Sequence, residues 1–505
     1  MESEIDAGGY LGEAIAGGRP DQLFRAYETR DVRFDGRFFV GVTTTGIFCR
    51  PVCPARTPLR RNVRFFASAA AAFAAGLRPC LRCRPERAPA LRALAGGEAL
   101  VARALGAIDA GDLNAGSVEE LSARIGVTSR HLRRLFEVHL GATPIQVAQT
   151  RRLLFAKQLV EESALSLTDV AFASGFGSVR RFNTAFRETY ERAPSTLRSS
   201  NALLTAATLP TGAMEVRLGS MPGAQFGRLL EFYRTRAFKG VEVVNADDYR
   251  RSVELGGMAC TIRARRQKGS DALYLTSDLA ALAQLPHVVA RVKRMVDLEA
   301  PVAAVLAHLG RDPLLRPVLH EGVRVPCAWD PFELAVRAIL GQQVTVKAAT
   351  TLAGRLVERF GAALPESSID HRLQPTRLFP HAQALARTPL ADICALGVIR
   401  KRAESLIGLA RHVVDDPDWR TRYDGLDAFV GRMTELPGIG VWTAQYVAMR
   451  GFADTDAFPD GDLGLLRSAN RLGIASTARE LARHAERWRP WRAYAAQALW
   501  NLNLV

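Results

Sequence analysis

The chain has 505 residues, enough for about three to five domains. Hydrophobic residues make up 48% and charged residues 23%, which excludes wholesale disorder, and no uncharged apolar stretch is long enough to predict a membrane span. The net charge of +16 and the lack of a signal-peptide pattern favour a cytoplasmic protein with a polyanionic partner, nucleic acid first; a basic surface that serves solubility alone is the alternative.

Four cysteines form the first distinctive feature along the chain. Cys49, Cys53, Cys80 and Cys83 have the spacing C-x3-C-x26-C-x2-C, and two close pairs separated in this way are typical of a tetrahedral zinc site. Neighbouring prolines favour the tight turns from which both thiols of a pair reach one ion. Two disulfides are the alternative, but a cytosolic chain keeps its thiols reduced. Residues 51–87 also hold eight Arg and a single acidic residue, which suggests a contact surface for an anion.

The residues around both pairs, from Asp35 to Arg56 and from Ala75 to Pro85, closely resemble the N-terminal domain of the Ada family of methyl-phosphotriester repair proteins and regulators. The resemblance covers about residues 20–88. It implies that Cys49 accepts a methyl group from a DNA phosphotriester as a zinc-bound thiolate, with the other three cysteines as ligands. Methylation would remove one negative charge and so raise the affinity for DNA. A purely structural zinc site is the alternative.

Helices are predicted across residues 90–200. Ser117 and Glu120 form a capping box, Gly126 provides a turn, and apolar residues mark the buried face of the helix that follows. A looser copy surrounds Gly175, and a helix from about Pro144 to Glu161 joins the two units. This pair of helix-turn-helix units resembles the DNA-binding domain of the AraC family.

That resemblance implies that the second helix of each unit enters the major groove of promoter DNA. The side chains expected to contact DNA are Arg130, His131, Arg133, Arg180 and Arg181. A solvated helix face is the alternative for some of them. A zinc domain followed by such a module is the Ada arrangement, and it implies transcriptional activation triggered by methylation.

The pattern changes after residue 200. Residues 201–213 are typical of a linker, and five short strand-like runs with one amphipathic helix then predict a small antiparallel α+β subdomain. From about residue 286 the pattern is helical to the end. The segment from Leu436 to Gly440 predicts a helix-hairpin-helix turn, in which Gly438 and Gly440 let the backbone approach a phosphate.

Asp462 follows 22 residues after Gly440. Together these features resemble the helix-hairpin-helix DNA glycosylases, and over residues 210–505 the AlkA-type 3-methyladenine glycosylases. The resemblance implies that Asp462 is the catalytic carboxylate, which stabilises positive charge on the deoxyribose and orients a water. Asp460 is the local competitor, and a helix cap before Leu463 is the alternative role for Asp462.

Further positions are carried over from the same family. Trp442 stands where bifunctional relatives carry a Schiff-base lysine, which implies hydrolysis without a lyase step or a cofactor. Trp442, Tyr446 and Trp500 match the aromatic pocket that attracts a cationic N-alkylpurine, although each could be a core residue. The tyrosine common after the catalytic aspartate is Leu463 here. Gln343 matches the side chain that fills the gap left by the flipped base.

We therefore predict a multidomain, mostly α protein with α+β parts. Its parts are a four-cysteine zinc domain (1–90), an AraC-type double helix-turn-helix domain (91–200), a linker (201–213), an α+β subdomain (214–285) and an all-α helix-hairpin-helix glycosylase domain (286–505). We expect one zinc ion, alkylated and promoter double-stranded DNA and RNA polymerase as partners, and a monomer in the bacterial cytoplasm, at the nucleoid. The predicted function is a fused alkylation sensor, regulator and glycosylase; the alternative is a regulator whose glycosylase-like half is a non-catalytic DNA clamp.

Overall fold

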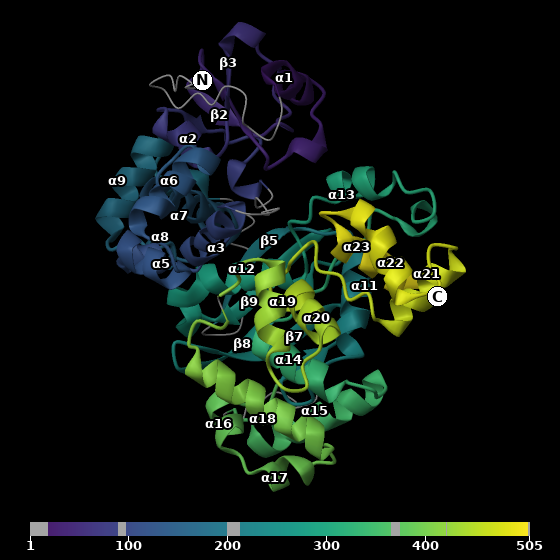
Figure 1. Ribbon diagram of the computed structural model, residues 1–505. Helices are drawn as coiled ribbons and strands as arrows, with labels where there is room; N and C mark the ends of the chain where they lie inside the picture. Colours follow the sequence, from purple (N-terminus) through teal and green to yellow (C-terminus); the bar gives the residue numbers. More distant parts are fainter. Residues whose placement is uncertain (1–18, 89–96, 199–212, 365–373, 421, 503–505) are drawn as a thin grey trace. The chain divides into compact units, whose positions relative to one another are not determined.

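The computed structural model describes residues 19–88, 97–198, 213–364, 374–420 and 422–502 (Figure 1). The chain divides into two compact units. The first unit consists of Met1–Val216, Leu282–Ala290 and Glu299–Ala304, and the second of Arg217–Ala281, Arg291–Leu298 and Val305–Val505. No helix in the described ranges is long and apolar enough to cross a membrane.

A four-stranded sheet in the order β3-β1-β2-β4 forms the N-terminal part of the first unit, which we call the zinc module (residues 19–88). Its elements are α1 (Pro20–Glu28), β1 (Phe39–Val42), β2 (Ile47–Cys49), β3 (Val63–Phe66), α2 (Ala69–Ala74) and β4 (Arg78–Pro79). β1 pairs antiparallel with β2 and β3, whereas β2 and β4 are parallel. Phe38, Phe48 and Phe66 are fully buried and stabilise this small sheet by removing apolar surface from water.

The remaining helices of the first unit form two helix-turn-helix units, as predicted. They are α3 (Gly97–Asp109), α4 (Asp112–Ala115), α5 (Val118–Ile125), α6 (Ser129–Leu140), α7 (Pro144–Glu162), α8 (Leu167–Ala173) and α9 (Val179–Tyr190). The capping box is confirmed, because the Ser117 hydroxyl accepts from the Glu120 amide while the Glu120 carboxylate accepts from the Ser117 amide. Gly126 and Gly175 make the two turns with φ of 81° and 83°, a left-handed conformation that favours glycine.

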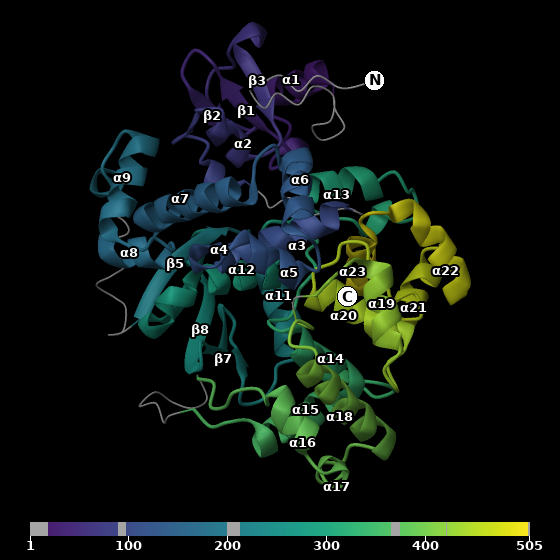
Figure 2. The same ribbon diagram turned by 60° about the vertical axis from the view of Figure 1, so that its left-hand side comes forward.

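A buried group of charges holds the zinc module against α7, the long helix that packs against both α2 and α8 (Figure 2). Lys157 of α7 is fully buried and donates to the Glu86 carboxylate at 2.5 Å, and Arg84 donates to the same oxygen at 3.0 Å. Arg84 also pairs with Glu161 and Glu162 at the end of α7. We call these five residues the α7 clamp. Buried charges are tolerated only when they are paired, so the clamp links the zinc module firmly to α7, the helix that joins the two helix-turn-helix units.

A five-stranded sheet follows, in the order β5-β9-β8-β7-β6. Its elements are β5 (Ala213–Ser220), α11 (Gly223–Arg234), β6 (Glu242–Val244), β7 (Asp248–Leu255), β8 (Met258–Arg266) and β9 (Ala272–Asp278). The pairs β6–β7, β7–β8 and β8–β9 are antiparallel, and all five predicted strand-like runs coincide with strands. Of the predicted linker, residues 201–212 lie outside the described ranges, and Ala213 already begins β5.

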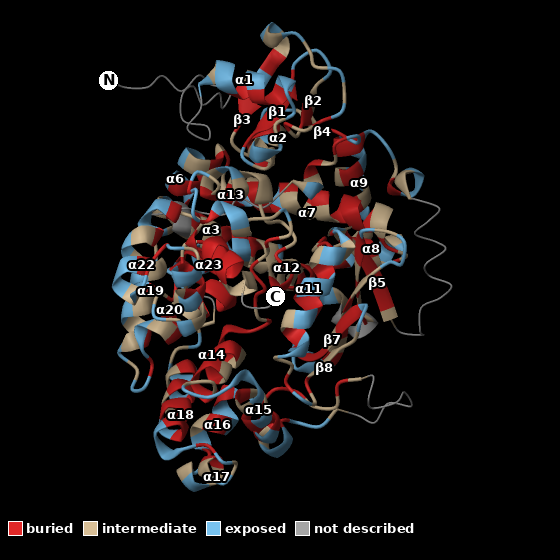
Figure 3. Cartoon of the chain, turned by 90° about the vertical axis from the view of Figure 1, so that its right-hand side faces the viewer, coloured by how far each residue is buried: buried red, intermediate tan, exposed pale blue. Residues whose placement is uncertain are grey.

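The rest of the chain is helical, as predicted. The helices are α12 (Leu285–Met295), α13 (Val302–Leu309), α14 (Pro331–Leu340), α15 (Val346–Phe360), α16 (Ala382–Arg387), α17 (Leu390–Cys394), α18 (Arg400–Asp415), α19 (Leu426–Thr434), α20 (Val441–Gly451), α21 (Leu463–Arg471), α22 (Ala478–Ala485) and α23 (Arg492–Asn501). Buried residues cover almost the whole of α14 and α23, which are core helices (Figure 3). α20 packs between α14 and α19, and α23 packs against α21.

Candidate zinc and base-excision sites

The four cysteines of the zinc module converge because their strands are neighbours. β2 and β4 lie parallel, so Cys49 at the end of β2 and Cys80 just after β4 emerge at the same edge of the sheet. A tight turn then brings the second thiol of each pair, Cys53 or Cys83, back to the first. All four Sγ atoms lie within 4.8 Å of one another, which suits the roughly 2.3 Å Zn–S bonds of a tetrahedral site.

A backbone amide distinguishes one of the four thiols from the others. Of the four sulfur atoms, that of Cys83 is the one that accepts a backbone amide hydrogen bond within the described part of the chain, from the Arg50 nitrogen at 3.3 Å. A hydrogen bond stabilises thiolate charge and lowers its reactivity, so this amide favours the other three thiols, Cys49 among them, as nucleophiles.

Positive charge surrounds this cluster. The Arg50 side chain is largely buried, pairs with Asp35 and also donates to the Cys83 carbonyl at 3.1 Å. Four arginines of the basic segment, residues 51–87, are exposed and have no carboxylate partner among the described residues. They are Arg56, Arg61, Arg64 and Arg82. Free guanidinium groups of this kind suit DNA phosphates.

The predicted DNA-reading side chains lie on the second helix of each unit. Arg130, Arg180 and Arg181 are exposed at the start of α6 and α9, and His131 is half-buried. Arg133 is exposed too, but it pairs with Glu119 of the preceding helix at 2.7 Å. The arrangement therefore leaves four of the five side chains available to DNA without first breaking an ion pair.

The hairpin between α19 and α20 has the backbone that its glycines predict. Gly438 has φ of 80°, and a Cβ atom there would lie 1.9 Å from the Ser405 Oγ, so no larger residue fits. Gly440 caps α20 without a side-chain bond, which leaves the first amides of the helix able to hold a phosphate. The Gln342 amide donates to the Gly438 carbonyl at 2.9 Å and ties the next loop to the hairpin.

That loop presents Gln343. Its side chain is exposed and its backbone has φ of 57°, in the left-handed region that non-glycine residues rarely adopt. Strain of this kind persists where the surrounding structure enforces it, and it is frequent at functional positions. Gln343 is therefore an exposed side chain on a strained backbone.

The Asp462 carboxylate is held by hydrogen bonds from three elements. Its Oδ1 accepts from the Trp500 indole at 2.8 Å and from the Leu465 amide at 2.9 Å, and its Oδ2 accepts from the Trp442 indole at 3.1 Å. Asp462 therefore does cap α21, and both indoles fix its orientation as well. Both indole N–H groups donate to Asp462 and not to Asp460, the local competitor.

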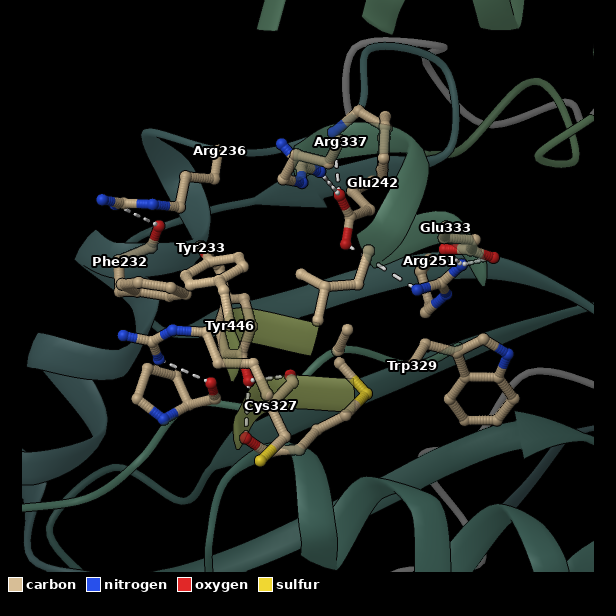
Figure 4. Close-up of a pocket in the computed structure, with 16 residues that line it drawn as sticks. Phe232, Tyr233, Arg236, Glu242, Arg251, Cys327, Trp329, Glu333, Arg337 and Tyr446 are labelled. Carbon is tan, nitrogen blue, oxygen red and sulfur yellow. Dashed lines mark hydrogen bonds and ion pairs between the residues drawn. The ribbon is translucent and has the colours of Figure 1, made fainter. Parts of the chain in front are cut away.

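The predicted aromatic residues form a column along α20. The rings of Trp442 and Tyr446 stack with centroids 5.2 Å apart and planes 8° from parallel. Tyr446 also lines a cavity, together with Phe232 of α11 on the same side and the ion pair of Arg251 with Glu333 on the opposite side (Figure 4). Leu463, at the family's tyrosine position, is 68% exposed.

Phe232 and Arg450 are among the cavity residues that sequence reasoning missed. Phe232 lies far from the motifs, in the α+β subdomain, and no local pattern distinguishes it from a core residue. Arg450 follows Trp442 and Tyr446 at the helical spacing of four residues, so the periodicity of α20 was a usable signal for it.

Comparison with protein families finds four matching models along the chain. The matching models are the metal binding domain of Ada (residues 22–86), a helix-turn-helix domain (121–200), the AlkA N-terminal domain (215–330) and the HhH-GPD superfamily base excision DNA repair protein (336–492).

One relative spans all four parts. The chain is 38% identical over 95% of its length to the "Probable bifunctional transcriptional activator/DNA repair enzyme AlkA" of Mycobacterium tuberculosis, and covers 96% of that protein. This chain belongs to the same Ada–AlkA fusion family. The four cysteines are accordingly the site of a single Zn²⁺ ion, and DNA is a partner of the helix-turn-helix and glycosylase domains.

Relatives of each half exist as separate proteins. The DNA-3-methyladenine glycosylase 2 of Escherichia coli is 32% identical over 56% of this chain and 95% of its own length. The bifunctional transcriptional activator/DNA repair enzyme Ada of the same organism is 36% identical over 32% of this chain and 45% of its own length. The fusion family thus unites a sensing and a base-excision module in one chain.

Proposed function

We propose that this protein senses DNA alkylation on Cys49, activates transcription through its helix-turn-helix units and excises alkylated bases of the 3-methyladenine type at Asp462. The observation that best supports base excision is the Asp462 carboxylate, which two indoles hold in place. It lies beside an aromatic column and a hairpin that can hold a phosphate. A DNA clamp without chemistry needs the hairpin but has no use for an oriented carboxylate. RNA polymerase is the partner that activation requires, and we propose that the chain acts as a monomer in the bacterial cytoplasm, at the nucleoid.

In the sensing step, a zinc ion held by the four cysteines would keep their thiols deprotonated at neutral pH. The Cys49 Sγ attacks the methyl carbon of a phosphotriester. The S–C bond forms as the C–O bond breaks, and the electron pair stays on the phosphate oxygen. Exposed arginines around the cluster hold the adjacent phosphates, and the loss of one negative charge from the cluster then strengthens DNA binding.

In the excision step, the flipped base lies against the aromatic column while Gln343 fills the gap in the duplex. The C1′–N bond breaks and its electron pair leaves with the base. Asp462 stabilises the positive charge that develops on the deoxyribose and orients a water towards C1′. The water oxygen bonds to C1′, and its proton is released to the base or to solvent. Trp442 cannot form a Schiff base, so the reaction ends at the abasic site.

The excision hypothesis is tested by measuring the release of 3-methyladenine from methylated duplex DNA. The rates of the full-length wild-type protein and of its Asp462→Asn variant are compared. Asparagine caps a helix as well as aspartate does, so this variant should stay folded and bind DNA. We expect about a 100-fold or greater loss of release, the size seen when a preorganised electrostatic group is removed. Equal release by the two proteins would refute the excision hypothesis and favour a non-catalytic DNA clamp.

The sensing hypothesis is tested by measuring how much methyl group the Cys49→Ser variant takes up from phosphotriester-containing DNA. Zinc content is measured alongside, because the substitution removes a ligand as well as the nucleophile. We expect zinc-loaded Cys49→Ser to acquire no methyl group. Cys260→Ser is the matched control, because this other buried thiol lies in β8, away from the zinc module. Methylation of zinc-loaded Cys49→Ser at wild-type levels would refute the assignment.

A further inference from the structure

Two arginines on either side of the second cysteine pair join the zinc module to the helix-turn-helix domain. Arg84 directly follows Cys83 and belongs to the α7 clamp. Arg78 lies in β4, two residues before Cys80, and pairs with Glu191, the residue that follows α9. β4 packs against α9 (Figure 3). A metal ion that binds Cys80 and Cys83 therefore fixes a segment that contacts the ends of both α7 and α9.

The α7 clamp itself adjoins the end of α9. Tyr190, the last residue of α9, is buried, and its pKa is raised well above the ordinary value by burial and by the nearby carboxylates of Glu86 and Glu161. Arg87 adds a further ion pair with Glu162, so that each of the three carboxylates has a cationic partner. The ends of α7 and α9 thus meet the zinc module at one buried polar cluster.

The zinc module also holds the end of α6. We call α6 and α9, the second helices of the two helix-turn-helix units, the recognition helices. The Ser68 hydroxyl caps α2 and donates to the carbonyl of Leu140, the last residue of α6, at 2.6 Å. Ala70 of α2 is 3% exposed and belongs to the same hydrophobic cluster as Phe136 and Leu140 of α6. The zinc module therefore supplies part of the core of the first helix-turn-helix unit.

Backbone strain marks two of these contact points. Arg84 has φ of 56° and Glu191 has φ of 51°, both in the left-handed region that non-glycine residues rarely adopt. Such conformations persist where the surrounding contacts enforce them. Both residues form ion pairs between the zinc module and the helix-turn-helix domain. The junction is therefore a specific contact that holds its own backbone in an unfavourable conformation.

One small module thus contacts the ends of α6, α7 and α9. We infer that the zinc module braces the two recognition helices, so that zinc coordination by Cys80 and Cys83 sets the spacing between the two major-groove contacts. The module is then a specificity-determining part of promoter recognition as well as the methyl acceptor. This inference rests on the proposed regulatory function.

A braced pair of helices recognises the spacing of two half-sites as well as their sequence. One extra base pair moves the second half-site by about 3.4 Å along the DNA axis and rotates it by about 35°. Recognition helices held at three ends cannot follow this shift without breaking the contacts to Leu140, Glu191 or the α7 clamp. Helices joined by α7 alone have no such contacts to break and tolerate the shift better.

The test uses a duplex that the zinc-loaded full-length protein selects from a random-sequence pool. Two further duplexes carry one base pair more or one fewer between the two half-sites that the protein protects. We expect zinc-loaded protein to bind the selected duplex about tenfold more tightly than either of the others, and chelation to reduce this ratio to about twofold. The ratio is the readout, because chelation also weakens the module's own DNA contacts. An unchanged ratio after chelation would show that α7 alone sets the spacing and would overturn the inference.

Glu191→Gln removes the contact at the end of α9 while zinc stays bound. Because it removes a negative charge, the affinity for DNA should stay constant or rise, whereas the spacing ratio should fall about threefold. Glu188→Gln is the matched control, because it removes the same charge from an exposed position on the same helix. We expect this control to keep the wild-type ratio.

The double variant Lys157→Met, Glu86→Gln tests the α7 clamp. It removes one cation and one carboxylate together, so neither is left buried without its partner. We expect the same loss of spacing preference at full zinc content, with thermal unfolding showing that the protein stays folded. A wild-type ratio in both Glu191→Gln and the double variant would overturn the inference. Failure of the zinc-loaded wild-type protein to select any sequence would instead refute the proposed regulatory function, and the inference with it.

Discussion

The sensing site and the excision site differ in the N–H donors that reach their reactive groups. In the zinc module one backbone amide donates to the cluster, from Arg50 to Cys83, and within the described residues none donates to Cys49, the proposed nucleophile. In the glycosylase domain such donors converge on Asp462, the reactive group itself. A nucleophile must give its electrons away, so hydrogen bonds would weaken it. A carboxylate that stabilises positive charge must stay ionised and in place, so hydrogen bonds serve it.

Removing zinc should separate the two sites most strongly. Chelation leaves four buried thiols without their ion, so we expect loss of methyl uptake and unfolding of the zinc module. Base release, which needs no residue of that module, should change by less than about twofold, within the usual scatter for independent sites. Methyl transfer and base release are measured on the same chelated sample. Loss of both activities together would show that the sites depend on each other.

Replacing either tryptophan by phenylalanine tests the role of the N–H donors to Asp462 in the excision site. Trp442→Phe and Trp500→Phe keep an aromatic ring and remove one N–H donor to Asp462. We expect each to lower the base-release rate about tenfold, the value of one charge-assisted hydrogen bond. Tyr446→Phe is the control, because that residue stacks on Trp442 but makes no bond to Asp462. A loss in Tyr446→Phe as large as in the tryptophan variants would contradict an orienting role.

Gln343→Gly should have the smallest effect of these substitutions. It should stabilise the fold and slow base release. Glycine relieves the left-handed backbone at this position, which raises the free energy of unfolding by about 1 kcal/mol. It also removes the wedge, so we expect base release from duplex DNA to fall several-fold and release from single-stranded DNA to change less. Thermal unfolding and the two rates provide the measurements. A slower rate on both substrates would argue against the wedge.

Local rules predicted much of this molecule. The capping box at Ser117, the turn at Gly126, the strand-like runs after residue 213 and the hairpin at Gly438 depend on neighbouring residues, and the structure contains all of them. The metal site was predictable because two close cysteine pairs require a common ion. The assignment of roles to Cys49 and Asp462 came from family resemblance and stays a prediction.

Other features depend on packing between distant segments. Asp462 meets indoles 20 residues before it and 38 residues after it, and Lys157 meets Glu86 across 71 residues. No pattern of spacing or charge pairs such partners in advance. The same holds for Phe232 beside Arg450, because a half-buried phenylalanine and a charged helix residue each suggest an ordinary role until the fold brings them together.

The α7 clamp has a practical consequence for dividing the chain into fragments. A fragment that ends near residue 88 would retain Arg84 and Glu86 but lose Lys157, Glu161 and Glu162, so a carboxylate side chain that is 2% exposed in the intact chain would lose its lysine partner and face solvent. A fragment that begins after the zinc module would leave Lys157 buried without Glu86. The smallest portion suited to expression on its own is therefore the whole segment of residues 19–198, which contains all five residues of the α7 clamp.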